Sequence, residues 1–225
     1  VTGVPMVNLA TKVMLGRDLN ELGYGTGLWK KQNLVGVKSP VFSMSKLAGV
    51  DTYLGPEMKS TGEVMGIDQS FGMAFAKAQL STGIRFLDKG SVFISVKDMD
   101  KRNALEIAKE FSELGYGIVA TKGTAQYLKK NKLKVTHINK VKEGSPHIVE
   151  KIKTGKIQFV VNTTSGDQSI KDSYSLRRAS LTTNIPYYTT IAGSFALLKA
   201  LKALKNKDMK VTSLQDYAIL SAKNN

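Results

Sequence analysis

Hydroxyl, amide and glycine residues follow three β-rich segments of the chain. Ser95 closes the first segment, Thr121 to Thr124 follow the second, and Asn162 to Gly166 follow the fourth. Glycine lets a backbone approach an anion, hydroxyls donate hydrogen bonds, and a following helix adds its positive end. Each loop alone is more typical of a turn with a helix cap than of a binding site. Three such loops at one sheet edge, with Lys101 and Lys140 as cations, predict a phosphate-binding site.

Other reactive side chains point to structural roles. The chain has no cysteine, which excludes thiolate nucleophiles, thiolate metal sites and disulfides. His137 follows a strand and is expected to pack against the sheet, and His147 stands at a helix start, with no acid partner evident for either. Glu57 and Glu63 lie in a Gly-Pro-Glu and Ser-Thr-Gly-Glu context that favours turn and capping roles. We therefore predict no catalytic residue and no metal ligand.

The elements that must position these loops alternate in type from Ser91 onward. Short β-rich runs separated by longer helical runs predict an α/β fold with a doubly wound parallel sheet, in which ligands bind at the carboxyl ends of the strands. The expected strands are 92–96, 117–120, 135–138, 157–162 and 186–189, and the expected helices are 101–114, 124–130, 146–153, 169–183 and 194–205.

Residues 1 to 85 are organised differently. Helical periodicity predicts helices at Val4–Leu22 and Gln69–Ser81, separated by glycine-rich, irregular sequence up to about Gly66. We expect this part to be a mainly helical partial domain, followed by a linker and a second domain at 86–225. Because the chain opens at Val1 without an initiator methionine, we expect it to be a piece of a longer protein.

Composition limits the partners. The chain is 42% hydrophobic, which is typical of a globular protein, and its net charge is +15. The lysines are spread along the chain without interleaved aromatic residues, so a solvated basic surface is favoured over nucleic-acid binding. There is no apolar stretch of membrane-spanning length and no signal peptide, so we expect a cytoplasmic protein with no membrane partner.

One segment carries a family resemblance. Leu54-Gly-Pro-Glu-Met-Lys-Ser-Thr-Gly-Glu-Val-Met-Gly66 resembles very closely a segment near the end of the second ATP-grasp half of carbamoyl phosphate synthetase large chains. The resemblance continues through 74–79, 139–148, Asn162-Thr-Thr-Ser-Gly166 and Arg177-Arg178, and so covers nearly the whole chain. It implies that residues 1–85 are the tail of the carbamoyl phosphate synthetic domain and that 86–225 are a methylglyoxal-synthase-like regulatory domain.

The resemblance also implies two effector sites. In that family the phosphate of an allosteric UMP or IMP is held by residues that correspond here to Ser95, Lys101, Thr121, Thr124, Lys140, Asn162, Thr163 and Thr164. Asp172, Tyr187 and Thr189 match part of a second, ornithine-type site. Ser39 stands where the family places a glutamate that meets the ornithine amine, so that site lacks one carboxylate here.

The parent enzyme implied by the resemblance makes carbamoyl phosphate from glutamine or ammonia, bicarbonate and ATP, with Mg or Mn and K. Its ATP-binding residues would precede Val1, so this part is expected to hold no cofactor and to be inactive alone. The implied partners are the rest of the large chain, a small glutaminase chain and, as an open possibility, further copies of itself.

Two alternatives stay open at this point. Thr163-Thr-Ser-Gly-Asp-Gln168 resembles a stretch of methylglyoxal synthase, a lyase, and places Asp167 where a catalytic carboxylate could stand. The later histidine and aspartate of that enzyme are absent, and one carboxylate cannot supply the whole proton relay. The third reading is a docking or oligomerisation module without an effector site.

Overall fold

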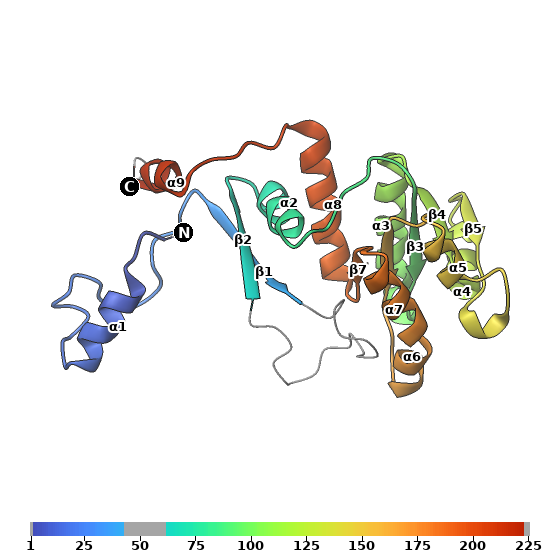
Figure 1. Cartoon of the computed structure of the whole chain (residues 1–225), viewed down its shortest axis with the longest axis horizontal. Coiled ribbons are helices and arrows are strands. Elements are labelled where there is room, and N and C mark those ends of the chain that lie inside the picture. Colours follow the sequence, from blue (N-terminus) through green and yellow to red (C-terminus); the bar gives the residue numbers. More distant parts are fainter. Residues whose placement is uncertain (1, 43–61, 223–225) are drawn as a thin grey trace.

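The computed structural model describes residues 2–42 and 62–222 (Figure 1). Its N-terminal unit consists of α1 (Met6–Met14), β1 (Val35–Val41), β2 (Gly62–Asp68) and α2 (Phe71–Ser81). The first eight residues of the Leu54–Gly66 motif lie outside the described residues. The remaining five belong to β2, which pairs with β1 in antiparallel register.

Three expectations for this unit need correction. The predicted helix 4–22 ends at Met14, because Gly16 adopts a φ of +88° that a right-handed helix cannot contain. Residues 35–41 and 62–66 form strands rather than irregular sequence. Glu63, expected in a turn, lies in β2 and forms an ion pair with Lys38 across the ribbon.

The predicted parallel sheet is confirmed. Its strands are β3 (Ser91–Ser95), β4 (Gly117–Ala120), β5 (Val135–His137), β6 (Phe159–Asn162) and β7 (Tyr187–Tyr188). They form a five-stranded parallel sheet in the order β5-β4-β3-β6-β7. All five lie within the ranges predicted from β-rich runs, apart from Ser91 at the start of β3.

The helices between these strands also follow the expected pattern, with one break. They are α3 (Lys101–Glu113), α4 (Lys122–Lys130), α5 (Ile148–Lys153), α6 (Asp167–Asp172), α7 (Tyr174–Thr182) and α8 (Ile191–Asn206), with short 3-10 turns η2 (Asp98–Asp100) and η3 (Val141–Glu143). The single predicted helix 169–183 is divided at Ser173. The C-terminal α9 (Leu214–Ala222) was not predicted.

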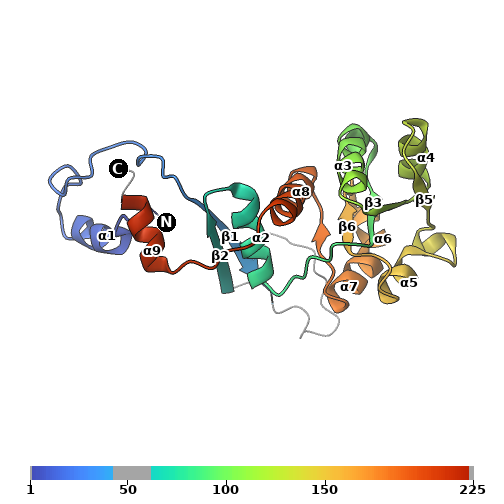
Figure 2. The ribbon, with the colours of Figure 1, turned by 90° about the horizontal axis from the view of Figure 1, so that it is seen from above.

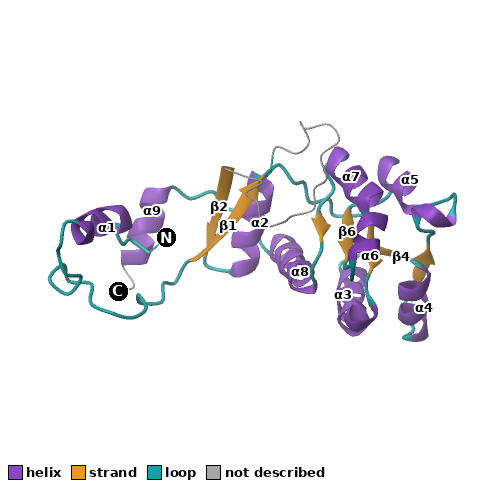
Figure 3. Ribbon diagram, turned by 90° about the horizontal axis from the view of Figure 1, so that it is seen from below, coloured by secondary structure: helices purple, strands orange, loops and turns teal. Residues whose placement is uncertain are grey.

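The core has two sides separated by the sheet. Val92 and Ile94 of β3 face a cluster built with α3, α4 and α8, whereas Phe93 faces a cluster built with α5 and α7. This alternation is the period-2 pattern of a strand that is buried on both faces. The views along the sheet in Figures 2 and 3 show the helices on its opposite faces, which completes the three-layer fold.

Helices α2 and α8 join the N-terminal unit to the sheet. They cross so closely that a Cβ atom on Gly72 would lie 2.5 Å from the carbonyl oxygen of Lys199. Met73, Ala76 and Ala200 form a small buried cluster at the crossing. Only glycine fits at the contact point, so this crossing depends on residue 72.

The C-terminal helix α9 returns to the N-terminal unit and is tied to it by Tyr217 (Figure 1). The Tyr217 hydroxyl donates to the carbonyl oxygen of Ile67 at 2.7 Å and accepts from Lys77 Nζ at 2.9 Å. Lys77 Nζ also lies 2.9 Å from Asp68 Oδ2. This partly buried network links β2, α2 and α9.

This network predicts that the folded state of the chain becomes less stable in acid. Burial alone would raise the pKa of Asp68, but hydrogen bonds from Lys77 and from the Ser70 backbone outweigh it and lower the pKa below 3.8. The stabilisation is therefore present at neutral pH and is lost as the pH falls below 3.8 through the folded-state pKa. We expect Asp68→Asn to lower the free energy of unfolding by about 1 kcal/mol at pH 7 and by less at pH 3.

Urea unfolding at both pH values measures this, with Asp208→Asn in the exposed loop before α9 as the control. If Asp68→Asn lowered the free energy of unfolding equally at pH 7 and pH 3, the ionised Asp68 carboxylate would not be the source of the stabilisation.

Within residues 2–42 and 62–222, no helix combines the length and apolar character that crossing a membrane requires.

Candidate functional site

The strand order creates a crevice at one edge of the sheet. From β3 the chain winds through β4 to β5, and it then crosses to the other side of β3 to form β6 and β7. The loops after β3 and β6 therefore leave in opposite directions, and helices α3 and α7 cover opposite faces. Ligands of doubly wound sheets bind at such a switch point. Ser95 and Asn162, the last residues of β3 and β6, are register partners there.

Three buried threonines and the half-buried Ser95 line this edge. Ser95 Oγ lies 3.0 Å from Thr121 Oγ1, and the backbone N–H groups of Val96 and Lys97 donate to Thr124 Oγ1 and Thr163 Oγ1 at 3.3 and 3.1 Å. Because the threonine oxygens accept these backbone protons, their own O–H protons are free to donate elsewhere. The structure thus brings four of the five predicted hydroxyl residues, Ser95, Thr121, Thr124 and Thr163, into one cluster.

Lys101 supplies a cation beside the cluster. Its Nζ lies 3.7 Å from the point that a Cβ on Gly123 would occupy, so the ammonium group sits over the first turn of α4. It also lies 2.8 Å from Oδ1 of Asp98, an exposed carboxylate in η2. The hydrogen bond and charge of Lys101 lower the pKa of Asp98. The first turn of α4, Lys101 and the hydroxyls together can bind an anion.

Asp98 should compete with an anionic ligand for Lys101. We expect Asp98→Asn to strengthen the binding of a phosphate compound by about two- to fivefold, the range expected for an exposed ion pair. Titration at low and high salt measures this, because added salt should shrink the difference. Unchanged affinity at low salt would show that Asp98 does not restrain Lys101.

Two further predicted residues, Lys140 and Thr164, lie in the loops after β5 and β6. Lys140 precedes η3 and is exposed, and its backbone N–H donates to Glu143 Oε2 at 2.8 Å. Thr164 is half-buried after Thr163. Beside the loop that carries Lys140 lies a cavity of about 580 Å³, lined by Lys122, Ala125, Gln126, Lys129, His137, Asn139 and Glu143. It widens the polar edge between α4 and the loop after β5.

Asn162 is held by residues from two other elements. Its Nδ2 atom donates to Ser173 Oγ at 3.0 Å and to the Tyr187 hydroxyl at 2.6 Å. Ser173 stands at the break between α6 and α7, and Tyr187 lies in β7. The sequence did not single out Ser173, because the helical pattern runs through it; a serine inside such a pattern was the only signal.

The residues of the expected ornithine-type site have separate partners. Asp172 Oδ1 lies 2.6 Å from Lys142 Nζ, Tyr187 contacts Asn162, and Thr189 is exposed after β7. Ser39, the position of the missing carboxylate, is buried in β1 and accepts from Gln79 Nε2 at 3.1 Å. No carboxylate occupies that position to meet an amine.

Two expectations about histidines are corrected. His137 is exposed at the end of β5 rather than packed against the sheet. His147 does have an acid neighbour, because its Nε2 lies 3.6 Å from Glu150 Oε1 and its backbone N–H donates to Glu150 Oε2 at 2.9 Å. Glu150 thus caps the start of α5. Asp167 begins α6, but its side chain lies outside the described residues.

The chain is similar to a family model and to several known proteins. Residues 103–189 match the family model of the MGS-like domain. The chain is 45% identical to the protein named carbamoyl phosphate synthase large chain, C-terminal section, of Aquifex aeolicus, over 95% of this chain and 43% of that protein. It is 44% identical to the carbamoyl phosphate synthase large chains of Rhizobium meliloti and Archaeoglobus fulgidus, over 96% of this chain and 19% and 20% of theirs.

A crystal structure of methylglyoxal synthase from Elizabethkingia anophelis is also similar, with 13% identity and a TM-score of 0.43 over 49% of this chain and 78% of that one. The chain spans less than half the length of the curated relatives it matches. The matches to these carbamoyl phosphate synthase chains nevertheless cover 95–96% of this chain. Residues 103–189 form an MGS-like domain, and the chain is homologous to the C-terminal section of carbamoyl phosphate synthase large chains.

Proposed function

We propose that this chain is the C-terminal regulatory part of a cytoplasmic carbamoyl phosphate synthase large chain and that it binds a nucleoside monophosphate of the UMP or IMP type. The phosphate would bind where the loops after β3, β4 and β6 meet. The observation that carries this proposal is the largely buried hydroxyl cluster of Ser95, Thr121, Thr124 and Thr163 beside Lys101.

The arrangement suits a phosphate for a chemical reason. A phosphate monoester has only acceptor oxygens when fully ionised, so it needs several donors at once. The Thr124 and Thr163 oxygens each accept one backbone N–H, and no acceptor for their own O–H protons is found among the described residues, so these protons can donate to the ligand. Lys101 adds positive charge. This charge is not unpaired when no ligand is bound, because Lys101 then forms an ion pair with Asp98.

The bound nucleotide would regulate through the contacts between the sheet and the N-terminal unit. Such coupling requires that the nucleotide bind two states with different affinity, typically by about 1–3 kcal/mol. In the parent enzyme, the regulated reaction would form carbamoyl phosphate from glutamine or ammonia, bicarbonate and ATP. The small glutaminase chain and the rest of the large chain would be the partners.

Calorimetric titration of this chain with UMP and with IMP tests the proposal. Saturable binding of either nucleotide is the expected result. If neither binds to protein shown by circular dichroism to be folded, the proposal fails and a docking module becomes the better reading.

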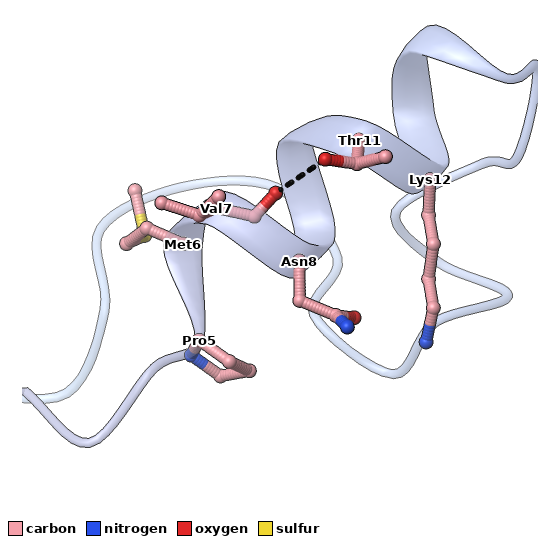
Figure 4. A pocket seen from close by; sticks show the side chains of 6 residues that line it. All are labelled: Pro5, Met6, Val7, Asn8, Thr11 and Lys12. Carbon is pink, nitrogen blue, oxygen red and sulfur yellow. Dashed lines mark hydrogen bonds between the residues drawn. The ribbon is translucent and has the colours of Figure 1, made fainter.

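The N-terminal unit would be the end of the synthetic, ATP-grasp domain, with a boundary near residue 85. Large apolar side chains of α1 and the loop after it are exposed: Met6, Val7, Met14, Leu15 and Leu28. A groove of about 770 Å³ runs along α1, lined by residues 5–8, Thr11 and Lys12. Figure 4 shows these side chains, with Thr11 bonded back to the carbonyl oxygen of Val7.

An exposed apolar surface of this kind marks a contact with another protein segment. We expect Leu15→Asp to leave the stability of this chain within about 0.5 kcal/mol, since Leu15 is exposed, but to abolish co-purification with the preceding ATP-grasp segment expressed as a separate chain. Asn103→Asp, at an exposed position of α3 outside this surface, adds the same negative charge and is the control. Undiminished co-purification of the Leu15 variant would place the contact elsewhere.

A further inference from the structure

The side-chain amide of Asn162 donates both of its N–H protons to other residues of the protein. Asn162 is 4% exposed at the end of β6, and its Nδ2 atom donates to Ser173 Oγ and to the Tyr187 hydroxyl. An amide nitrogen has only two hydrogens. None is left for a phosphate oxygen.

The orientation of this amide is fixed by its neighbours. The two ends of an asparagine amide have the same shape, so the hydrogen-bond network decides which end is the nitrogen. Ser173 Oγ donates its single proton to the carbonyl oxygen of Ser169 at 2.9 Å. It can therefore only accept from Asn162, which places Nδ2 toward Ser173 and Tyr187 and directs Oδ1 away from them.

Oδ1 is thus the atom that Asn162 presents at the sheet edge. Among the described residues no hydrogen-bond partner is found for Oδ1. A carbonyl-type oxygen accepts and never donates, so it repels an ionised phosphate and attracts an O–H or N–H group. In a nucleoside monophosphate such donors occur only in the ribose and in the base.

We propose that Asn162 is a specificity-determining residue that recognises a donor group in the nucleoside part of the effector, and that Ser173 and Tyr187 are its positioning residues. This inference rests on the proposed function. It differs from the family-based expectation for Asn162, which assigned it to the phosphate. The phosphate would then be held by the hydroxyl cluster and Lys101 alone.

The test compares ligands that carry different parts of the nucleotide. UMP, ribose 5-phosphate and inorganic phosphate are titrated into the unsubstituted chain, Tyr187→Phe and Ser173→Ala, and binding is followed by NMR chemical shifts, which reach millimolar constants. Loss of one positioning hydrogen bond should weaken UMP by about three- to tenfold and change inorganic phosphate by less than about twofold. Tyr188→Phe is the matched control, because its hydroxyl faces Gln79 rather than Asn162.

Each outcome decides a different point. Weakening of ribose 5-phosphate along with UMP supports recognition of a ribose hydroxyl, and weakening of UMP alone supports recognition of a base N–H. Equal weakening of UMP and inorganic phosphate, or no weakening of UMP in folded variants, overturns the role of Asn162. If the unsubstituted, folded chain does not bind UMP at all, the proposed function itself fails and this inference with it.

Discussion

Replacing Lys101 by alanine is expected to weaken UMP or IMP binding by about ten- to a hundredfold, the cost of losing a charge-assisted hydrogen bond at a partly buried site. The ammonium group lies over the first turn of α4, beside Thr124, and its side chain is 23% exposed. The charge is therefore less screened than that of a surface lysine. Calorimetric titration of the folded variant measures the loss.

The matched control is Lys109→Ala. Lys109 is exposed and lies two turns further along α3 than Lys101. Its replacement by alanine removes the same charge from the chain. Because its ammonium group is not placed at the sheet edge, nucleotide affinity should change by less than about twofold at 0.15 M salt, where distant surface charges are largely screened. Similar losses in both variants would mean that overall charge, rather than a built site, attracts the nucleotide.

The largest stability effect is expected from Phe159→Ala. Phe159 is fully buried in β6, and its ring centroid lies 5.4 Å from that of Tyr116, 5.9 Å from Phe111 and 6.3 Å from Phe86. Removing the ring leaves a cavity among three aromatic side chains that cannot all collapse into it. We expect the free energy of unfolding to fall by about 3–5 kcal/mol.

Urea unfolding followed by circular dichroism measures this change. Phe71→Ala on α2 is the control, because Phe71 is 41% exposed and pairs with Phe75 at the surface of the crossing with α8. Its loss should be less than half as large, since less apolar area leaves water on folding at that position. Equal losses would show that the aromatic cluster around Phe159 is not the centre of the core.

Tyr116 belongs to the same cluster and reports on its integrity. Burial, with a smaller effect from Asp88, raises the pKa of the Tyr116 phenol to about 12, and its hydroxyl donates to the carbonyl oxygen of Leu87 at 2.6 Å. In Phe159→Ala we expect this pKa to fall toward 10 as water enters the cavity. A spectrophotometric titration of tyrosine ionisation would detect the change.

The sequence by itself determined the parallel sheet. Strands β3, β4 and β6 are short runs rich in β-branched and aromatic residues that are buried on both faces, and their length and composition favour parallel strands over helices. Their order along the chain, with helices between them, requires parallel crossovers. The sequence therefore also placed Ser95, Thr121, Thr124 and Thr163 at one edge of the sheet, because the carboxyl ends of parallel strands all lie at that edge.

Local pattern could not predict the antiparallel ribbon of the N-terminal unit. Each strand of β1–β2 is half-exposed and contains a proline or glycines, so its stability comes from pairing and from α2 rather than from its own residues. The α9 helix was missed for the same reason. It is positioned by Tyr217, whose partners Ile67 and Lys77 are more than 100 residues away in sequence.

The roles within the site were decided by tertiary structure alone. The sequence shows that Asn162 follows a strand, but not whether its amide donates to a ligand or to the protein. That depends on Ser173 at the break between α6 and α7 and on Tyr187 in β7, which only the folded chain brings to it. Residue types fix what a side chain can donate or accept, whereas the neighbours that compete for those bonds are set by the fold.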